Sequence, residues 1–237
     1  QDPGSMAMKK DGVTVTSFGT DVTAKGDYRL DMGTNELCER HEAFMRMADL
    51  PVAGTHNALN ALAAVALCRG IGIEMAPLVE GLKSFKGLPH RVEDVGTING
   101  VTFYDDSKGT NVGSTVAALN GMTVPVVLIA GGIGKEQDFS PLAEPVRKRA
   151  KAVVLIGKDA RLIESAITSA RVSTVHAGSM SDAVEKAYAS ASPGDAVLLS
   201  PACSSFDMFK NYNHRGEVFA ECVQALKQKV EGGTNAV

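Results

Sequence analysis

The sequence predicts an α/β protein that ends in a Rossmann-like domain built on a parallel sheet. Two observations lead to this prediction. Beyond residue 100, short continuous apolar runs alternate with helical stretches, which is typical of a parallel sheet covered by helices on both faces. A segment rich in helix breakers, Lys86 to Pro89, separates this part from a smaller unit that precedes it.

The first part of the chain, residues 7–88, is predicted to be a small and incomplete α/β unit. Its clearest helix, His56 to Cys68, has Thr55 as the expected N-cap and Gly70 as a stop signal. The expected strands are Val13 to Phe18 and Tyr28 to Leu30, a second helix is Met75 to Leu82, and Glu36 to Ala48 is ambiguous. These elements are thin for an independent core, so we expect the tail end of a larger domain.

The second part, residues 89–237, is predicted to be a compact Rossmann-like domain of ordinary size. Asn99-Gly100 is a strong two-residue turn signal and predicts a hairpin at its start. The expected strands are Arg91 to Val95, Val101 to Tyr104, Val126 to Ala130, Ala152 to Ile156, Val172 to Val175 and Ala196 to Ser200. The expected helices are Val112 to Leu119, Pro141 to Arg149, Ala160 to Ala170, Ser181 to Ala189 and Arg215 to Lys229.

The composition argues against nucleic-acid and membrane partners. The formal net charge is −3 and the pI about 6.0, so bulk electrostatics attract neither nucleic acid nor anionic lipid. No apolar run approaches the roughly 18–20 residues that span a bilayer, and no signal peptide is present. The 4 cysteines form no CxxC pair and show no metal-ligand spacing with the 5 histidines. We expect a cytoplasmic monomer, and we expect Gln1 to Met6 to be an expression-tag remnant.

Three loops of the second part are rich in polar and charged residues, and each follows a predicted strand. They are Asp105 to Asn111, Gly131 to Lys135 and Pro201 to Asp207. In a doubly wound sheet such loops converge on one edge, where ligands bind. Glycines allow backbone N–H groups to approach an anion, and Lys135 adds a positive charge. The three loops together predict a site that binds carboxylates. A solvated turn with Asp and Asn as helix caps is the alternative for any one of them.

Other residues are open to more than one interpretation. Asn57 and Asn60 share a helix face although asparagine is a poor helix former, which suggests amide recognition of a polar ligand. The loop Gly131 to Lys135 is not a Walker A motif, because Ile129 stands where the leading glycine is needed. Cys203 lies among apolar residues with no histidine nearby in sequence, which favours a buried structural thiol over a nucleophile.

Taken in order, four motifs resemble the Mur ligase family, the ATP-dependent amino-acid-adding enzymes of peptidoglycan synthesis. The resemblance runs from Val13 to about Lys229. The matching segments are Gly54 to Ala61, Gly87 to Glu93, Asp106 to Asn111, and Ser200 to Asp207 continuing through Phe209 to Asn211. The resemblance implies that residues 7–88 are the C-terminal part of an α/β ATPase-like central domain. It implies that residues 89–237 are the family's C-terminal, amino-acid-binding domain.

The resemblance also implies roles for ten residues. Five would hold D-glutamate, with the lysine and the hydroxyls on its carboxylates: Thr110, Lys135, Ser205, Phe206 and Tyr212. Five would face ATP, the asparagines toward adenine, the arginine toward phosphate and the aspartate toward ribose: Asn57, Asn60, Arg91, Asp106 and Lys108. Phe206 and Tyr212 stand where the family is expected to carry an apolar residue and an aromatic residue.

In such ligases ATP and magnesium phosphorylate the carboxylate of UDP-N-acetylmuramoyl-L-alanine, and the amine of D-glutamate attacks the resulting acyl phosphate. The family's phosphate loop, magnesium ligands and carbamylated lysine have no counterpart in this sequence, so no complete catalytic set is expected and the chain alone should be inactive. A member that adds L-alanine, a diamino acid or glutamate to folate is one alternative, which the segment Ser200 to Ser205 disfavours. A stand-alone, non-catalytic nucleotide- or amino-acid-binding module is another.

Overall fold

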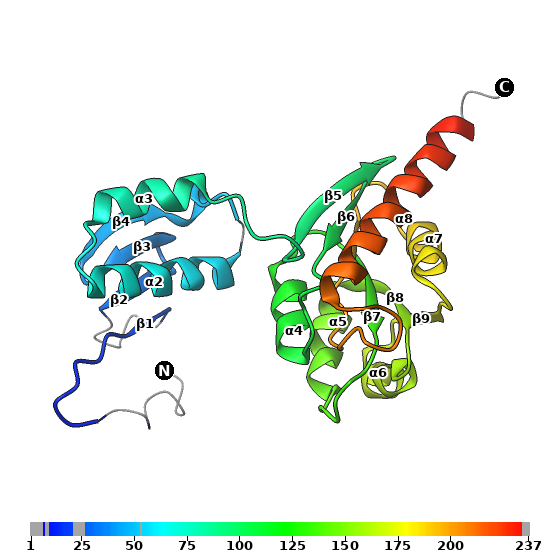
Figure 1. The fold of residues 1–237 in the computed structure, drawn as a ribbon, viewed down its shortest axis with the longest axis horizontal. Coiled ribbons are helices and arrows are strands. Elements are labelled where there is room, and N and C mark those ends of the chain that lie inside the picture. The colour runs from blue at the N-terminus through cyan, green and yellow to red at the C-terminus, as the bar shows by residue number, and fades with distance from the viewer. Residues whose placement is uncertain (1–6, 8–9, 21–26, 53, 234–237) are drawn as a thin grey trace. The chain divides into compact units, whose positions relative to one another are not determined.

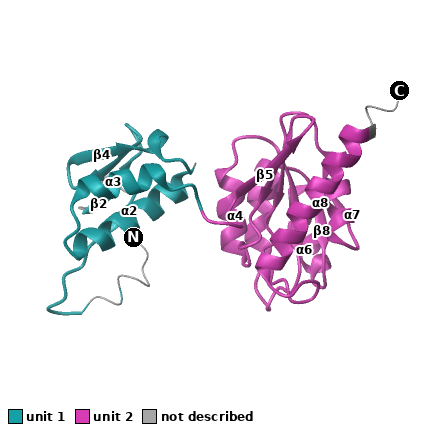
Figure 2. Cartoon of the chain, turned by 45° about the horizontal axis from the view of Figure 1, so that its top comes forward, with its two compact units in different colours: residues 1–87 teal, residues 88–237 magenta. Residues whose placement is uncertain are grey.

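A computed structural model describes residues 7, 10–20, 27–52 and 54–233, and the expected tag remnant lies outside them. The chain divides into two compact units, residues 1–87 and residues 88–237 (Figure 2). Each is described by itself below. No helix among these residues combines the length and apolar character needed to cross a bilayer.

The first unit packs two helices on a four-stranded sheet of order β1-β2-β3-β4 (Figure 1). Its strands are β1 (Phe18–Gly19), β2 (Tyr28–Asp31), β3 (Glu36–Glu39) and β4 (Glu42–Arg46), followed by the 3-10 turn η1 (Met47–Asp49) and the helices α2 (Thr55–Gly70) and α3 (Met75–Ser84). The stretch Glu36 to Ala48, which was ambiguous in the sequence, therefore forms the β-hairpin of β3 and β4 and the start of η1. Leu30, Leu37 and Leu62 are fully buried at its centre.

Two details of the sequence prediction are wrong in this unit. The strand expected at Val13 to Phe18 is reduced to Phe18–Gly19, because only these residues pair with β2. Val13 and Val15 are 60% and 45% exposed, so the apolar residues of this alternating pattern do not pack into a core. Gly54, with φ +101°, is the N-cap of α2, and Thr55 is its first residue.

The second unit is a six-stranded sheet of order β5-β6-β10-β7-β8-β9 with helices on both faces. Its strands are β5 (Glu93–Ile98), β6 (Val101–Asp105), β7 (Val126–Gly131), β8 (Ala150–Ile156), β9 (Ser173–His176) and β10 (Ala196–Leu199). Its helical elements are α4 (Val112–Gly121), η2 (Ser140–Leu142), α5 (Ala143–Arg149), α6 (Ala160–Ile167), η3 (Thr168–Ala170), α7 (Met180–Ser190) and α8 (Tyr212–Gly233). This confirms the predicted Rossmann-like parallel sheet.

The hairpin at the edge of this sheet also agrees with the prediction. Strands β5 and β6 are antiparallel, and all other neighbouring pairs are parallel. Asn99 and Gly100 both have positive φ, 47° and 80°, which matches the type I′ turn that an Asn-Gly pair favours.

Alternation along the central strands divides the core into two layers. Leu128 and Leu198 pack against α4, α5 and α6 on one face. Ile129 and Leu199 pack against α7 and α8 on the other. Because both faces are covered, the strands read as continuous apolar runs, which is why they were recognisable in the sequence.

Candidate functional site

The three polar loops meet because their strands are neighbours. Strand β10 lies between β6 and β7 and is parallel to both, so the carboxyl ends of all three strands share one edge (Figure 1). Loop residues also bond to one another there. Gly131 N donates to Pro201 O at 2.9 Å, and Ile133 and Ser204 exchange two backbone hydrogen bonds of 2.9 Å. The expected convergence is confirmed.

Asp106 lies in a buried polar cluster directly after β6. Ser200 Oγ donates to Asp106 Oδ2 at 2.6 Å and lies 3.0 Å from Thr115 Oγ1. All three side chains are buried, Asp106 being 7% exposed. Burial raises the pKa of the Asp106 carboxyl to about 7, although the Ser200 hydrogen bond opposes the shift and the neighbouring Asp105 adds to it.

The side chain of Asp105 holds His90 at the start of the unit. His90 Nδ1 lies 2.7 Å from Asp105 Oδ2, and Ser107 N donates to Asp105 Oδ1 at 2.8 Å. His90 N donates in turn to Glu93 Oε2 at 2.9 Å. Burial raises the pKa of Asp105, whereas the hydrogen bonds from His90 and Ser107 lower it.

His90, Glu93 and Asp105 are the one group of three candidate metal ligands among the described residues. The set does not fit magnesium. Magnesium prefers oxygen ligands in octahedral geometry and keeps several waters. Here one of the three ligands is an imidazole nitrogen. Both oxygens of Asp105, and one of Glu93, are already hydrogen-bonded.

Arg215 joins two of the loops from the helix α8. Arg215 is 1% exposed, and its guanidinium donates to Ser107 Oγ at 2.9 Å, to Ser107 O at 2.8 Å and to Cys203 O at 3.1 Å. Burial lowers the pKa of Arg215 to about 10 and raises that of the Cys203 thiol to about 12. Cys203 is thus a buried, protonated thiol at neutral pH, as the sequence indicated.

The five residues assigned to D-glutamate lie in or next to these loops, with differing exposure. Lys135 is exposed and Thr110 half-buried. Ser205 is 3% exposed and Phe206 67%. Tyr212 begins α8, and Lys108 Nζ lies 4.0 Å from its ring centroid, a cation–π contact.

Two of the residues assigned to ATP line a depression of about 580 Å³ in the second unit. Its walls include Arg91, Lys108 and Tyr212, with His90 and Glu217 beside them. Tyr212 is therefore on the wall that carries the assigned phosphate-binding arginine. Asn57 and Asn60 lie one turn apart on α2 of the first unit, Asn57 half-buried and Asn60 exposed.

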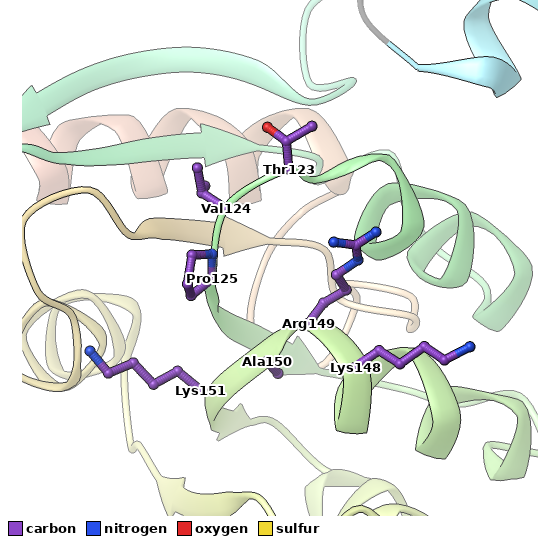
Figure 3. A pocket seen from close by; sticks show the side chains of 7 residues that line it. All are labelled: Thr123, Val124, Pro125, Lys148, Arg149, Ala150 and Lys151. Carbon is purple, nitrogen blue, oxygen red and sulfur yellow. The ribbon is translucent and has the colours of Figure 1, made fainter.

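A second depression, of about 340 Å³, lies near the amino ends of β7 and β8, away from the three loops (Figure 3). Lys148, Arg149 and Lys151 line it, and the two lysine side chains point away from each other. Lys148 pairs with Glu144 at 3.1 Å and Lys151 with Asp195 at 2.8 Å. None of the residues that line this depression belongs to the three polar loops, so we assign the site to the loop edge.

Comparison with known proteins shows the family of this chain. Residues 90–203 match the family model described as "Mur ligase, glutamate ligase domain". A UDP-N-acetylmuramoylalanine–D-glutamate ligase from Thiobacillus denitrificans is 53% identical over 226 residues, which is 95% of this chain and 48% of the relative. The chain belongs to the Mur ligase family.

A second Mur ligase of the same name, from Aromatoleum aromaticum, is 54% identical over 94% of the chain and 49% of its own length. The chain thus spans about half the length of the curated relatives it matches. Two solved Mur ligases share the fold. The UDP-N-acetylmuramate-alanine ligase of Thermotoga maritima matches with a TM-score of 0.65 at 22% identity, over 90% of this chain and 48% of that one. MurF of Acinetobacter baumannii matches with a TM-score of 0.64 at 20% identity, over 88% and 47%.

Several residues of the candidate site were not identified from the sequence. Arg215 was read only as the start of a helix, and Ser200 as the end of a strand. For Arg215 a signal was available: it precedes Val218 and Phe219 by three and four positions, which places it on the apolar face of an amphipathic helix. No local signal marks Ser200 or Thr115, because their hydrogen bonds join residues about 90 positions apart.

Proposed function

We propose that this chain forms part of the cytoplasmic, ATP-dependent ligase that adds D-glutamate to UDP-N-acetylmuramoyl-L-alanine in peptidoglycan synthesis. The observation that carries the proposal is the name shared by relatives that are more than half identical over nearly the whole chain. In this proposal residues 7–88 belong to the central nucleotide-binding domain. Residues 89–237 are the amino-acid-binding domain, and the protein is a monomer.

The residues proposed for D-glutamate suit its charges. The amino acid carries two carboxylates and an ammonium group at neutral pH. Lys135 would pair with one carboxylate, and the hydroxyls of Thr110 and Ser205 would donate to carboxylate oxygens. Phe206 and Tyr212 would lie against the methylene groups. Together they would hold the amine for attack on an activated carboxyl carbon, a positioning role.

The residues proposed for the nucleotide suit a polyphosphate. Arg91 and Lys108 place two cations on one depression, and Asp106 lies in the turn that carries Lys108. The Asp106 carboxylate would accept hydrogen bonds from ribose hydroxyls, and Asn57 and Asn60 would recognise adenine through their amides. ATP, when bound, supplies the phosphoryl group that activates the acceptor carboxylate. Because the described acidic cluster does not suit magnesium, we assign no metal ligand to it.

Binding of D-glutamate to the isotope-labelled chain tests the proposal. Chemical-shift changes should fall in the three loops and saturate with D-glutamate, and L-glutamate should bind more weakly. Lys135→Ala should raise the Kd about 10- to 100-fold, because a charge-assisted contact contributes roughly 1.5–3 kcal/mol.

Lys148→Ala is the matched control, since Lys148 is an exposed lysine at the opposite edge of the same sheet. The Kd of this variant should equal that of the original chain. An unchanged Kd in Lys135→Ala, or an equal loss in both variants, would refute the assigned carboxylate site.

A further inference from the structure

Gln137 is the residue whose side chain ties all three site loops together. It lies two positions after Lys135 in the loop that follows β7, and it is half-buried. Its Oε1 accepts from Val112 N at 2.9 Å, and its Nε2 donates to Ala202 O at 2.7 Å. Val112 follows the loop of Thr110, and Ala202 precedes Ser205 in the third loop.

The partners of this amide determine its orientation. A backbone N–H can only donate, and a backbone carbonyl can only accept, so the oxygen must face Val112 and the NH₂ group must face Ala202. Val112 N is the first N–H of α4 and has no partner within the helix. The Gln137 side chain therefore supplies an acceptor that the helix lacks and a donor that the third loop needs.

The backbone next to Gln137 requires such support. Lys135 and Glu136 have φ of +53° and +59°, and two successive residues other than glycine rarely adopt this left-handed conformation. Such conformations persist where the surroundings hold them. Gly134 N donates to Asp159 Oδ2 at 2.8 Å on one side of the pair, Gln137 N donates to Gly134 O across it at 3.2 Å, and the Gln137 side chain fixes the other side to the two neighbouring loops.

We propose that Gln137 is a positioning residue for the D-glutamate site, setting the place of Lys135 relative to the loops of Thr110 and Ser205. The proposal rests on the proposed function, since Lys135 is its assigned carboxylate ligand. Gln137 touches no substrate in this proposal and acts through the backbone that carries the lysine. Without this amide, the left-handed turn keeps the Gly134 N–Asp159 bond and the backbone bond from Gln137 N to Gly134 O at 3.2 Å, but it loses its ties to the other two loops.

Three variants test the role of the amide. Gln137→Ala removes both hydrogen bonds and the side-chain volume, Gln137→Met keeps the length without polar atoms, and Gln137→Glu keeps an acceptor for Val112 N but loses the donor to Ala202 O. We expect the Kd for D-glutamate to rise about 5- to 30-fold in the alanine and methionine variants, the effect of one or two lost hydrogen bonds. The glutamate variant keeps the bond from Val112 N but turns a carboxylate oxygen toward Ala202 O, where two acceptors repel each other, so it should bind no better than the methionine variant.

Amide hydrogen exchange without ligand gives a second readout. Exchange at Glu136, Val112 and Gln137 should accelerate in the alanine and methionine variants, because local opening becomes easier. Amides of β8 and α7 should be unchanged, which would exclude general destabilisation. Unchanged exchange at the loop amides, or a methionine variant that binds D-glutamate like the original chain, would overturn the proposal.

The two readouts separate this inference from the proposed function. If the original chain fails to bind D-glutamate while exchange at the loop amides still depends on Gln137, the substrate assignment fails. The positioning of Lys135 by Gln137 then stands.

Discussion

Asp106 is a residue whose protonation depends strongly on the fold. It is nearly buried, it accepts a 2.6 Å hydrogen bond from Ser200, and burial raises its pKa to about 7. A carboxyl with this pKa is partly protonated at neutral pH. In its protonated form it is a poorer acceptor for ribose hydroxyls, so nucleotide affinity should increase as pH rises through 7.

Asp106 should also make stability fall with rising pH. In the unfolded chain its pKa returns to about 3.9, so between pH 4 and 7 the folded state binds more protons than the unfolded state. Stability from this group is lost as pH rises through that window and is constant above it. Asp106→Asn removes this pH dependence. The free energy of unfolding of the variant, relative to that of the original chain, should therefore be about 2–3 kcal/mol higher at pH 8 than at pH 5. Urea unfolding of both proteins at the two pH values measures this, and parallel pH curves would contradict it.

Residue types in the site were readable from the sequence, whereas their partners were not. The run Asp105 to Asn111 stood out because mixed charge is dense in one strand-to-helix turn. The partners of that turn, Ser200 and Arg215, lie about 100 positions away, where no local pattern relates them. The roles given to the ten assigned residues remain predictions for the binding experiments above.

At the scale of single elements, the loop after β7 is the most tightly enclosed part of the site. A Cβ on Gly132 would lie 2.2 Å from Ser204 O, and the φ of Gly132 is +131°. Only glycine allows the second and third loops to approach this closely. The second and third loops are therefore in direct backbone contact.

Gly132→Ala should destabilise the second unit, because either the Ile133–Ser204 bridge or the backbone conformation must change. We expect a loss of about 2–4 kcal/mol in the free energy of unfolding, together with weaker D-glutamate binding. Gly178→Ala is the control, since nothing lies within 4 Å of a Cβ there and its φ is not positive. Chemical denaturation of both variants checks this, and an equal effect of the two substitutions would count against the close approach.

Elements buried on both faces were the easiest to predict. Strands β7, β8 and β10 are short apolar runs between breakers, and all three lie close to their predicted bounds. The error at Val13 to Phe18 arose because alternation alone does not supply a partner strand: within the segment 13–19, only Phe18 and Gly19 pair with β2. Hydrophobic pattern thus predicts a strand reliably only where a core exists to bury it.

At the scale of the whole molecule, each unit has a core of its own. Leu30, Leu37 and Leu62 belong to the cluster of the first unit, and two further clusters fill the second. The segment 85–88 that joins the units has no helix or strand, and Lys86 is exposed there. Such a segment is a preferred site of proteolysis.

Limited trypsin digestion should therefore accumulate a product that begins at Gly87. It should keep its D-glutamate affinity, because every residue assigned to that ligand lies in the second unit. Mass spectrometry and the NMR titration measure both. Lys86→Gln should slow formation of this product, and cleavage that begins within the sheet of the second unit would contradict the division.

The central place of β10 has a consequence for biosynthesis. Residues 196–199 are synthesised last of the six described strands of this sheet, yet they lie between β6 and β7, which are made about 70 to 100 residues earlier. Until they arrive, the nascent chain holds two strand edges that have no partner, and such edges favour aggregation. The edge that carries the three polar loops can therefore close only after β10 has been made.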